Sequence, residues 1–197
     1  MLKIRKIAKR DVIYPFYVKN KSANGKRREK MDSNQEMFFE HLVIGSGLAG
    51  LSSALMLAEK CGGEIAVVTK GAVEDCNSRL AQGGIACVTD QEDTFDEHIA
   101  DTINAGDHLC NPESVRSIVE AGPERIQWLT EIGTHFTTRG ELGDQNEAHK
   151  DEFDLGREGG HKKRRVIHAG DITGEEVATS FSPCFTTKGT DVLTRQS

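Results

Sequence analysis

The sequence has few of the features that build disulfide frameworks, metal centres or membrane spans. Its five cysteines are odd in number and include no C-x-x-C pair, so we expect neither a disulfide framework nor a zinc site, and a reducing, cytoplasmic compartment is favoured. The seven histidines lack a ligand spacing such as H-E-x-x-H, so no metal site is expected. No apolar run approaches the ~20 residues that a membrane-spanning helix needs.

Positive charge is scarce except at the start of the chain. The 197 residues are 37% hydrophobic and 28% charged, with a net charge of −6, which is typical of a globular protein. Residues 1–31 hold 11 Lys and Arg against 2 Asp and Glu, so they carry +9 and the remainder carries −15. This segment predicts a mobile arm. Its role stays open: it could contact nucleic acid or an anionic membrane, or act as a transit peptide. Alternatively, the true start of the protein is Met31 or Met37.

A glycine motif stands between a predicted strand and a predicted helix. Apolar residues predict strands over 40–45 and 64–69, and a helix-forming stretch covers 48–60. The motif G-x-G-x-x-G occupies residues 45–50. This context distinguishes a dinucleotide-binding strand–turn–helix–strand unit from a glycine-rich turn without a ligand. The predicted fold class is therefore α/β.

Each glycine of this motif has an expected role. Gly45 permits the tight turn, Gly47 lets the backbone approach a pyrophosphate, and Gly50 lets helix and strand pack closely. The N–H groups at the start of the helix would then face the phosphate charge.

The rest of the chain alternates short apolar runs with helix signals. Asn111-Pro112-Glu113 is a helix start, because it supplies a cap, a first-turn proline and an acid near the positive helix end. Gly122-Pro123 is expected to break that helix. The other predicted elements are a short strand at 85–88, a helix at 94–105, a helical face at Ile126, Leu129 and Ile132, an extended loop at 137–163, a strand at 166–169, and a helix through Val177 capped by Asp171 or Thr173.

The second predicted strand ends without the acid that usually binds the ribose hydroxyls of a dinucleotide. Thr69-Lys70 stands there instead, which makes plain NAD binding unattractive. Lys70 could favour an extra phosphate, as in an NADP site, contact the ribose or phosphate of another dinucleotide, or be a solvated lysine.

Two further glycine-containing segments carry candidate chemistry. Ala81-Gln82-Gly83-Gly84 follows Asn77 and Ser78, and successive glycines can expose backbone N–H groups to a ligand; a simple turn is the alternative. Arg157-Glu158-Gly159-Gly160-His161 offers a cation, a carboxylate and an imidazole on flexible backbone, although His161 alone is more often a surface histidine. The basic run at 162–165 is interpreted as solvated rather than as a nucleic-acid site.

Three motifs together resemble one flavoprotein family. G-S-G-L-A-G-L at 45–51, N-S-x-x-A-Q-G-G-I-A at 77–86 and R-E-G-G-H-x-x-x-R-V-I-H-A at 157–169 are similar to the family of L-aspartate oxidases, succinate dehydrogenases and fumarate reductases. Within it they resemble the L-aspartate oxidases most. The resemblance covers residues 40–179 and implies a Rossmann-like domain that binds FAD in an extended form.

The resemblance also implies roles for individual residues. Lys70 matches a lysine that aspartate oxidases carry at the end of the second strand, and Glu158 matches the carboxylate that orients the substrate amine. The pyrophosphate would be cradled by Ser46, Gly47, Leu48 and Ala49. The flavin would be wrapped by Asn77, Ser78, Arg79, Leu80, Ala81, Gln82, Gly83 and Gly84.

One position discriminates within the family. Succinate dehydrogenases and most fumarate reductases carry a flavin-linked histidine four residues before the alanine of A-Q-G-G. Asn77 occupies that position here. The resemblance therefore implies noncovalent FAD, as in the oxygen-reactive aspartate oxidases.

The activity implied is the oxidation of L-aspartate to iminoaspartate by hydride transfer to the flavin, with oxygen or fumarate as the electron acceptor. The product would enter NAD biosynthesis, with quinolinate synthase as a candidate partner. A succinate dehydrogenase or fumarate reductase flavoprotein and a nonenzymatic dinucleotide-binding remnant stay open as alternatives.

The expected organisation has three parts: a basic, disordered extension over 1–37, the N-terminal part of the FAD-binding domain over 38–179, and a divergent, disordered tail over 180–197. Pro183 is expected to break the last helix. The resemblance places the capping and C-terminal helical domains, with the catalytic arginine, beyond this chain. We therefore expect an incomplete domain, from a frameshifted or truncated gene, with little activity of its own.

Overall fold

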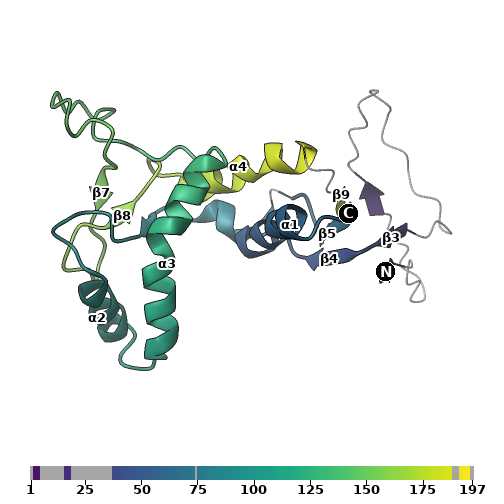
Figure 1. Cartoon of the computed structure of the whole chain (residues 1–197), viewed down its shortest axis with the longest axis horizontal. Coiled ribbons are helices and arrows are strands. Elements are labelled where there is room, and N and C mark those ends of the chain that lie inside the picture. The colour runs from purple at the N-terminus through teal and green to yellow at the C-terminus, as the bar shows by residue number, and fades with distance from the viewer. Residues whose placement is uncertain (1, 5–15, 19–36, 74, 188–190, 196–197) are drawn as a thin grey trace. The chain divides into compact units, whose positions relative to one another are not determined.

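The computed structural model describes residues 2–4, 16–18, 37–73, 75–187 and 191–195 (Figure 1). The chain divides into two compact units, one formed by Met1–Arg79 with Ala178–Ser197 and the other by Leu80–Val177. Most of the predicted basic arm lies outside the described residues, so its mobility and its role stay predictions.

The first unit is built on a four-stranded sheet in the order β2-β9-β5-β4. β4 (His41–Ile44) and β5 (Ile65–Thr69) are parallel, and the helix α1 (Leu48–Lys60) connects them. β9 (Asp191–Arg195) is parallel to β5 on its other side, and β2 (Phe16–Val18) is antiparallel to β9. A separate antiparallel pair joins β1 (Leu2–Ile4) to β3 (Met37–Phe39).

The core of this unit lies where α1 packs on β5. The helix buries one face, as its spacing of apolar residues predicts, and the strand is buried along most of its length. The side chains involved are Leu51, Ala54 and Leu55 from α1, Ile65, Ala66 and Val67 from β5, and Phe39 from β3.

The turn between β4 and α1 depends on two glycines. Gly45 has φ +107°, a conformation that favours glycine, and its N–H donates to the carbonyl of Val68 at 2.8 Å. A Cβ on Gly50 would lie 2.1 Å from the carbonyl oxygen of Gly45. The close packing predicted for Gly50 is therefore present in the structure.

The second unit combines a small antiparallel sheet with two long helices. β6 (Ile85–Ala86), β8 (Val166–Ile167) and β7 (Leu155–Gly156) pair in the order β6-β8-β7. The helices α2 (Phe95–Ala105) and α3 (Pro112–Glu131) pack side by side (Figure 1). The short 3-10 helix η1 (Asn77–Leu80) and α4 (Thr173–Thr187) both cross from one unit to the other.

Side chains cap both long helices, and the cap at Asn111 is the one that the sequence predicts. Thr94 Oγ1 accepts the N–H of Glu97 at 3.2 Å at the start of α2, and the Asn111 carboxamide oxygen accepts the N–H of Ser114 at 3.0 Å at the start of α3. Each cap satisfies a backbone donor that the first helical turn leaves without a partner.

Two predicted helix breaks are wrong. α3 continues through Pro123, and α4 continues through Pro183 to Thr187. Before Pro123, Gly122 has no Cβ to clash with the proline ring, which removes part of the usual penalty. A Cβ on Gly122 would lie 3.2 Å from Cys87 Sγ, so the helix packs closely against Cys87 at this glycine.

The predicted loop at 137–163 is wrong in part. Thr138 forms an antiparallel bridge with Phe153, and Leu155–Gly156 form β7 against β8. The rings of Phe136 and Phe153 also meet edge to face, with centroids 5.8 Å apart. The segment is therefore folded back on itself at its base.

The interior of the second unit contains a buried ion-pair network centred on Arg165. Its guanidinium binds both carboxylate oxygens of Asp93 at 2.8 Å and one oxygen of Asp101 at 3.0 Å. The Arg165 side chain is fully buried, and those of Asp93 and Asp101 are nearly so. The interpretation of 162–165 as a wholly solvated run is therefore wrong for Arg165.

A buried histidine lies beside this network. His98 makes an edge-to-face contact with His161 at 5.6 Å between ring centroids, and its Nδ1 has no hydrogen-bond partner among the described residues. Burial lowers the pKa of His98 below its ordinary value, and the nearby charge of Arg165 lowers it further. His98 is therefore held as the neutral imidazole.

Replacing Gly50 tests the turn. Gly50→Ala should lower the free energy of unfolding by about 1–3 kcal/mol, because the new methyl group overlaps a backbone oxygen that has little room to move. Urea unfolding measures this change. Gly71→Ala is the matched control, since its Cβ would lie 3.4 Å from a flexible Asp75 carboxylate; equal losses in the two variants would contradict the packing role.

Lowering the pH tests His98. Its folded-state pKa is lowered, so below about pH 6.5 the unfolded chain takes up a proton that the folded chain does not, and stability falls with pH. Between about pH 7.5 and 5.5 the melting temperature of His98→Gln should therefore fall less than that of the wild type. The control is His108→Asn at an exposed position with φ 58°, which asparagine tolerates. If the melting temperature of His98→Gln fell with pH as steeply as that of the wild type, the lowered pKa of His98 would be refuted.

Candidate functional site

The start of α1 offers backbone N–H groups to an anion. An α-helix leaves its first-turn N–H groups without intrahelical partners, and its N-terminus carries partial positive charge. The N-cap is Gly47, and the first turn contains no acidic residue. The N–H of Leu48 donates to Ser78 Oγ at 3.2 Å, so the structure brings Ser78 to the predicted phosphate cradle.

Ser46 contributes to this turn in a different way from its neighbours. Its buried hydroxyl donates to Thr69 Oγ1 at 3.0 Å and so ties the glycine turn to the end of β5. Ala49 is exposed at the helix start. The Ser46 hydroxyl is therefore engaged inside the unit, and only its backbone is left to contribute to the predicted cradle.

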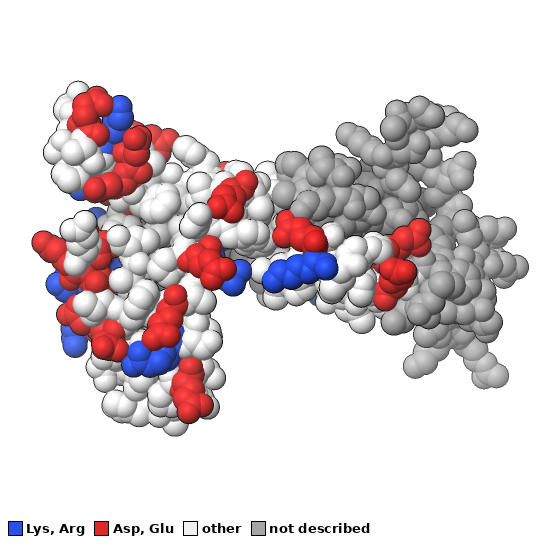
Figure 2. Space-filling model, viewed as in Figure 1, with Lys and Arg blue, Asp and Glu red and all other residues white. Residues whose placement is uncertain are grey.

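Lys70 lies at the same edge of the sheet as the glycine turn. It follows β5 directly and is exposed, and parallel strands bring their carboxyl ends to one edge. Acidic side chains outnumber basic ones on the described face shown in Figure 2. An anionic ligand would thus be attracted by local donors such as Lys70 rather than by the overall charge.

The second predicted segment begins at η1. Asn77 is exposed, and Leu80 keeps 77% of its surface exposed although it is apolar. Arg79 donates its N–H to the carbonyl of Cys76 at 3.2 Å. Ser46, Gly47, Leu48, Ala49, Lys70, Asn77, Ser78 and Arg79 all belong to the first unit.

The A-Q-G-G turn belongs to the second unit and is exposed throughout. The Ala81 carbonyl accepts the N–H of Gly174 at 2.8 Å, which joins the turn to the start of α4. A Cβ on Gly84, at φ +145°, would lie 2.5 Å from the carbonyl oxygen of Ile167. Glycine is therefore required at Gly84 by the neighbouring strand.

Glu158 lies beside this turn. A Cβ on Gly83 would be 3.8 Å from Glu158 Oε1, so the carboxylate reaches the glycine pair from the loop between β7 and β8. The N–H of His161 donates to the Glu158 carbonyl at 3.2 Å within the same loop. The structure thus brings Glu158 together with Leu80, Ala81, Gln82, Gly83 and Gly84 inside one unit.

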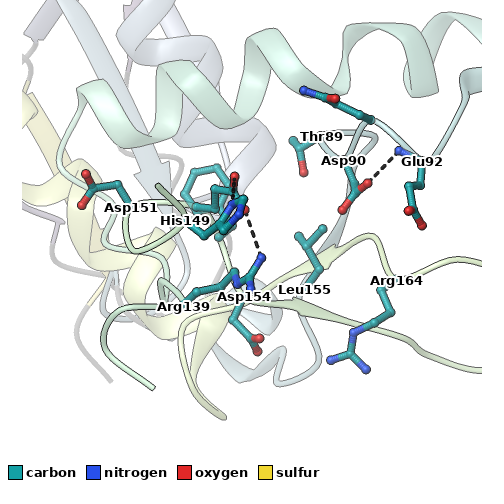
Figure 3. A pocket seen from close by; sticks show the side chains of 12 residues that line it. Thr89, Asp90, Glu92, Arg139, His149, Asp151, Asp154, Leu155 and Arg164 are labelled. Carbon is teal, nitrogen blue, oxygen red and sulfur yellow. Dashed lines mark hydrogen bonds and ion pairs between the residues drawn. The ribbon is translucent and has the colours of Figure 1, made fainter. Parts of the chain in front are cut away.

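A separate polar cavity of about 690 Å³ lies elsewhere in the second unit (Figure 3). Part of its charge is paired: Arg139 binds Glu152 at 3.2 Å and His149 binds Glu152 at 2.8 Å, and Arg139 also binds Asp144, outside the lining, at 2.7 Å. The hydrogen bond from His149 lowers the pKa of Glu152. None of the predicted site residues lines this cavity.

Sequence reasoning missed the acidic partners of Arg165. Two signals point to them: Arg165 directly precedes the apolar pair Val166-Ile167, and His98 and Asp101 lie three residues apart on one face of α2. Within the described ranges, no cluster of three or more His, Cys, Asp or Glu is arranged to hold a metal ion, and no helix combines the length and apolar character that crossing a membrane requires.

Curated proteins similar to this chain are L-aspartate oxidases. The enzyme of Pseudomonas aeruginosa is 47% identical over 139 residues, which cover 69% of this chain and 24% of that protein. The chloroplastic L-aspartate oxidase 2-b of Nicotiana tabacum is 41% identical over 159 residues, covering 80% of this chain and 23% of that protein. The chain spans about a quarter of the length of these relatives.

Solved structures with a similar fold include an Sdh1 complex and a quinol fumarate reductase. The Sdh1 complex of Mycobacterium smegmatis in the apo form superposes with a TM-score of 0.64 at 28% identity, covering 76% of this chain and 24% of that chain. A mutant FrdA of E. coli quinol fumarate reductase superposes with a TM-score of 0.66 at 22% identity, covering 80% of this chain and 31% of that chain. At that identity the likeness shows the fold alone.

The family match extends further than the motifs predict. It covers residues 40–197, whereas the motif resemblance ends at residue 179, and the divergence of the tail at 180–197 stays a prediction. The glycine turn at the start of α1, the exposed A-Q-G-G turn and the neighbouring Glu158 all fall inside this range. The chain belongs to the family of FAD binding domains.

Proposed function

We propose that the protein carrying this chain is a flavin-dependent oxidoreductase that converts L-aspartate to iminoaspartate. The observation that carries the proposal is the placement of the Glu158 carboxylate beside Gly83 in the A-Q-G-G turn. An exposed carboxylate at a flavin-wrapping turn is suited to receive the ammonium group of an amino acid. The names of the curated relatives, L-aspartate oxidase, support the same substrate.

The residues present fit FAD. The β4–α1–β5 unit has the arrangement of a Rossmann-like dinucleotide site, in which N–H groups of the first helical turn receive a pyrophosphate. Gly47 keeps the backbone accessible, since the nearest atom to its missing Cβ is Ser78 Oγ at 3.5 Å. In this proposal Ser46 to Ala49 and Ser78 hold the pyrophosphate, Lys70 binds the ribose or phosphate, and Asn77 to Gly84 hold the flavin.

FAD supplies the two-electron acceptor when it is bound, and the chain supplies orientation and charge. Glu158 would hold the ammonium group of L-aspartate through a charge-assisted contact. The exposed Leu80 offers an apolar surface beside the same turn. The proposal also includes three further points. The electrons pass to oxygen or fumarate, the product is delivered to quinolinate synthase in NAD biosynthesis, and the protein is cytoplasmic.

A succinate dehydrogenase or fumarate reductase flavoprotein is the second candidate. The likeness to the Sdh1 complex at 28% identity favours it. Asn77 argues against it, because a carboxamide is not nucleophilic enough to form the histidine-type flavin bond. The relative activity on L-aspartate and on succinate therefore separates the two candidates.

The first test asks whether FAD is held noncovalently. Because Asn77 offers no nucleophile, acid precipitation of the purified protein should release all of the flavin into the supernatant, where its absorbance is measured. A yellow pellet would contradict the proposal. Asn77→His serves as a comparison for a position that could form the bond.

The second test concerns Glu158. In the protein that carries this chain, Glu158→Gln should reduce the preference for L-aspartate over succinate, because the variant loses a charge-assisted contact worth ~1.5–3 kcal/mol, which corresponds to roughly 10- to 100-fold in the ratio of specificity constants. Steady-state kinetics with both substrates measure this ratio.

Glu124→Gln is the matched control, since Glu124 is an exposed acid on α3 whose ion-pair partner is the neighbouring Arg125. This control should keep the wild-type ratio. An unchanged ratio in Glu158→Gln would show that Glu158 does not recognise the amine.

A further inference from the structure

The loop that carries Glu158 has little to hold it except its backbone. In the part of the chain that the structure describes, the Glu158 carboxylate forms no hydrogen bond or ion pair. Gly159 and Gly160 follow it, and glycine is the most freely rotating residue. The position of the carboxylate therefore depends on how the ends of this loop are fixed.

One end is fixed by Asp101 from α2. Its Oδ2 accepts the backbone N–H of Lys162 at 2.9 Å, and its Oδ1 lies 3.6 Å from Lys162 Nζ. The Asp101 side chain is 2% exposed, whereas that of Lys162 is 69% exposed. The buried backbone contact is thus the stronger anchor, because the exposed ammonium contact is screened by water.

Asp101 is itself held rigidly. Arg165 donates to the same Oδ2 at 3.0 Å while its other guanidinium edge binds Asp93 in a two-pronged contact. Two bonds in one plane fix the orientation of the guanidinium. A mobile carboxylate would allow the Lys162 amide to move. The Asp101 carboxylate is instead held in place by Arg165.

Arg165 also closes the base of the loop. Its N–H donates to the Gly156 carbonyl at 3.0 Å, and its carbonyl accepts the Cys87 N–H at 2.8 Å. Near the tip, Gly160 adopts φ +86°. A Cβ placed on Gly160 would lie 3.5 Å from the Cβ of Ala105 in α2. Beyond Glu158 the loop is therefore anchored to α2 at Lys162, and it passes close to Ala105 of α2 at Gly160.

We propose that Asp101 is a positioning residue for Glu158: by fixing the Lys162 amide against α2 it sets where the Glu158 carboxylate stands beside Gly83, and so sets the preference for an amino dicarboxylate over a dicarboxylate without the amine. This inference rests on the proposed function. Asp101 acts through the loop and touches neither substrate nor cofactor in this scheme.

Two variants test the anchor in different ways. Asp101→Asn keeps the shape of the side chain and leaves Arg165 compensated by Asp93, while it weakens both contacts at Oδ2. Lys162→Pro removes the N–H donor together with the exposed ammonium contact to Asp101, and it leaves the buried ion pairs of Arg165 in place. Asp96→Asn is the matched control, because Asp96 is an acid of α2 that is 83% exposed and pairs with Arg116 at the surface.

The first readout is hydrogen–deuterium exchange of the 157–164 segment, which does not depend on activity. Exchange should be faster in Asp101→Asn and Lys162→Pro and unchanged in Asp96→Asn. Unchanged exchange in both loop variants would overturn the inference. Melting temperatures recorded alongside separate local loosening from loss of the fold.

The second readout is the ratio of specificity constants for L-aspartate and succinate in the FAD-loaded protein. Because a displacement near 1 Å can cost up to ~100-fold, we expect a loss of about tenfold in this ratio for both loop variants. Faster exchange with a wild-type ratio would overturn the positioning role while leaving the proposed function standing. A wild-type protein that does not oxidise L-aspartate would overturn the proposed function and the inference with it.

Discussion

The buried pairing of Arg165 with Asp93 and Asp101 is the interaction on which the second unit depends. Charges removed from water are costly unless their partners and hydrogen bonds are complete, and breaking such a pair costs about 3–5 kcal/mol. Here the guanidinium meets two carboxylates from the segment at the start of α2 and from α2 itself. The network therefore joins α2 to the β7–β8 hairpin beside the buried apolar pair Val166 and Ile167, and it gives the Glu158 loop a fixed frame.

The first unit depends on close backbone approach instead of charge. The turn into α1 places Gly50 against the carbonyl of Gly45, and the Ser46 hydroxyl ties the turn to Thr69 on the neighbouring strand. Because these contacts are internal, the amides at the helix start keep a fixed direction before any ligand arrives. Preorganised donors of this kind bind an anion without the entropic cost of ordering a loop.

Much of this architecture could be predicted from the sequence where local signals agree with tertiary packing. The helix at 48–60 follows from its apolar spacing and the glycines before it, and the caps at Thr94 and Asn111 follow from their side chains. Local rules failed at Pro123, where a glycine and the packing of Cys87 override the proline penalty. They failed again at Arg165, because a charge in a basic run looks solvated until its distant acids, 64 and 72 residues earlier, are brought beside it. For the candidate site, the sequence indicated the members and their chemistry, and the fold supplied what spacing cannot: the Ser78 contact with Leu48 and the nearness of Glu158 to Gly83.

The packing of Cys87 has a chemical consequence. Burial raises the pKa of its thiol to about 11, with the charge of Asp93 adding to the effect. At neutral pH only about one molecule in ten thousand would carry the thiolate at this position, and the thiolate is the nucleophile that reacts with peroxides. The Cys87 thiol, kept protonated beneath Gly122, therefore resists oxidation. This matters in a protein whose proposed reaction with oxygen would release an oxidant nearby.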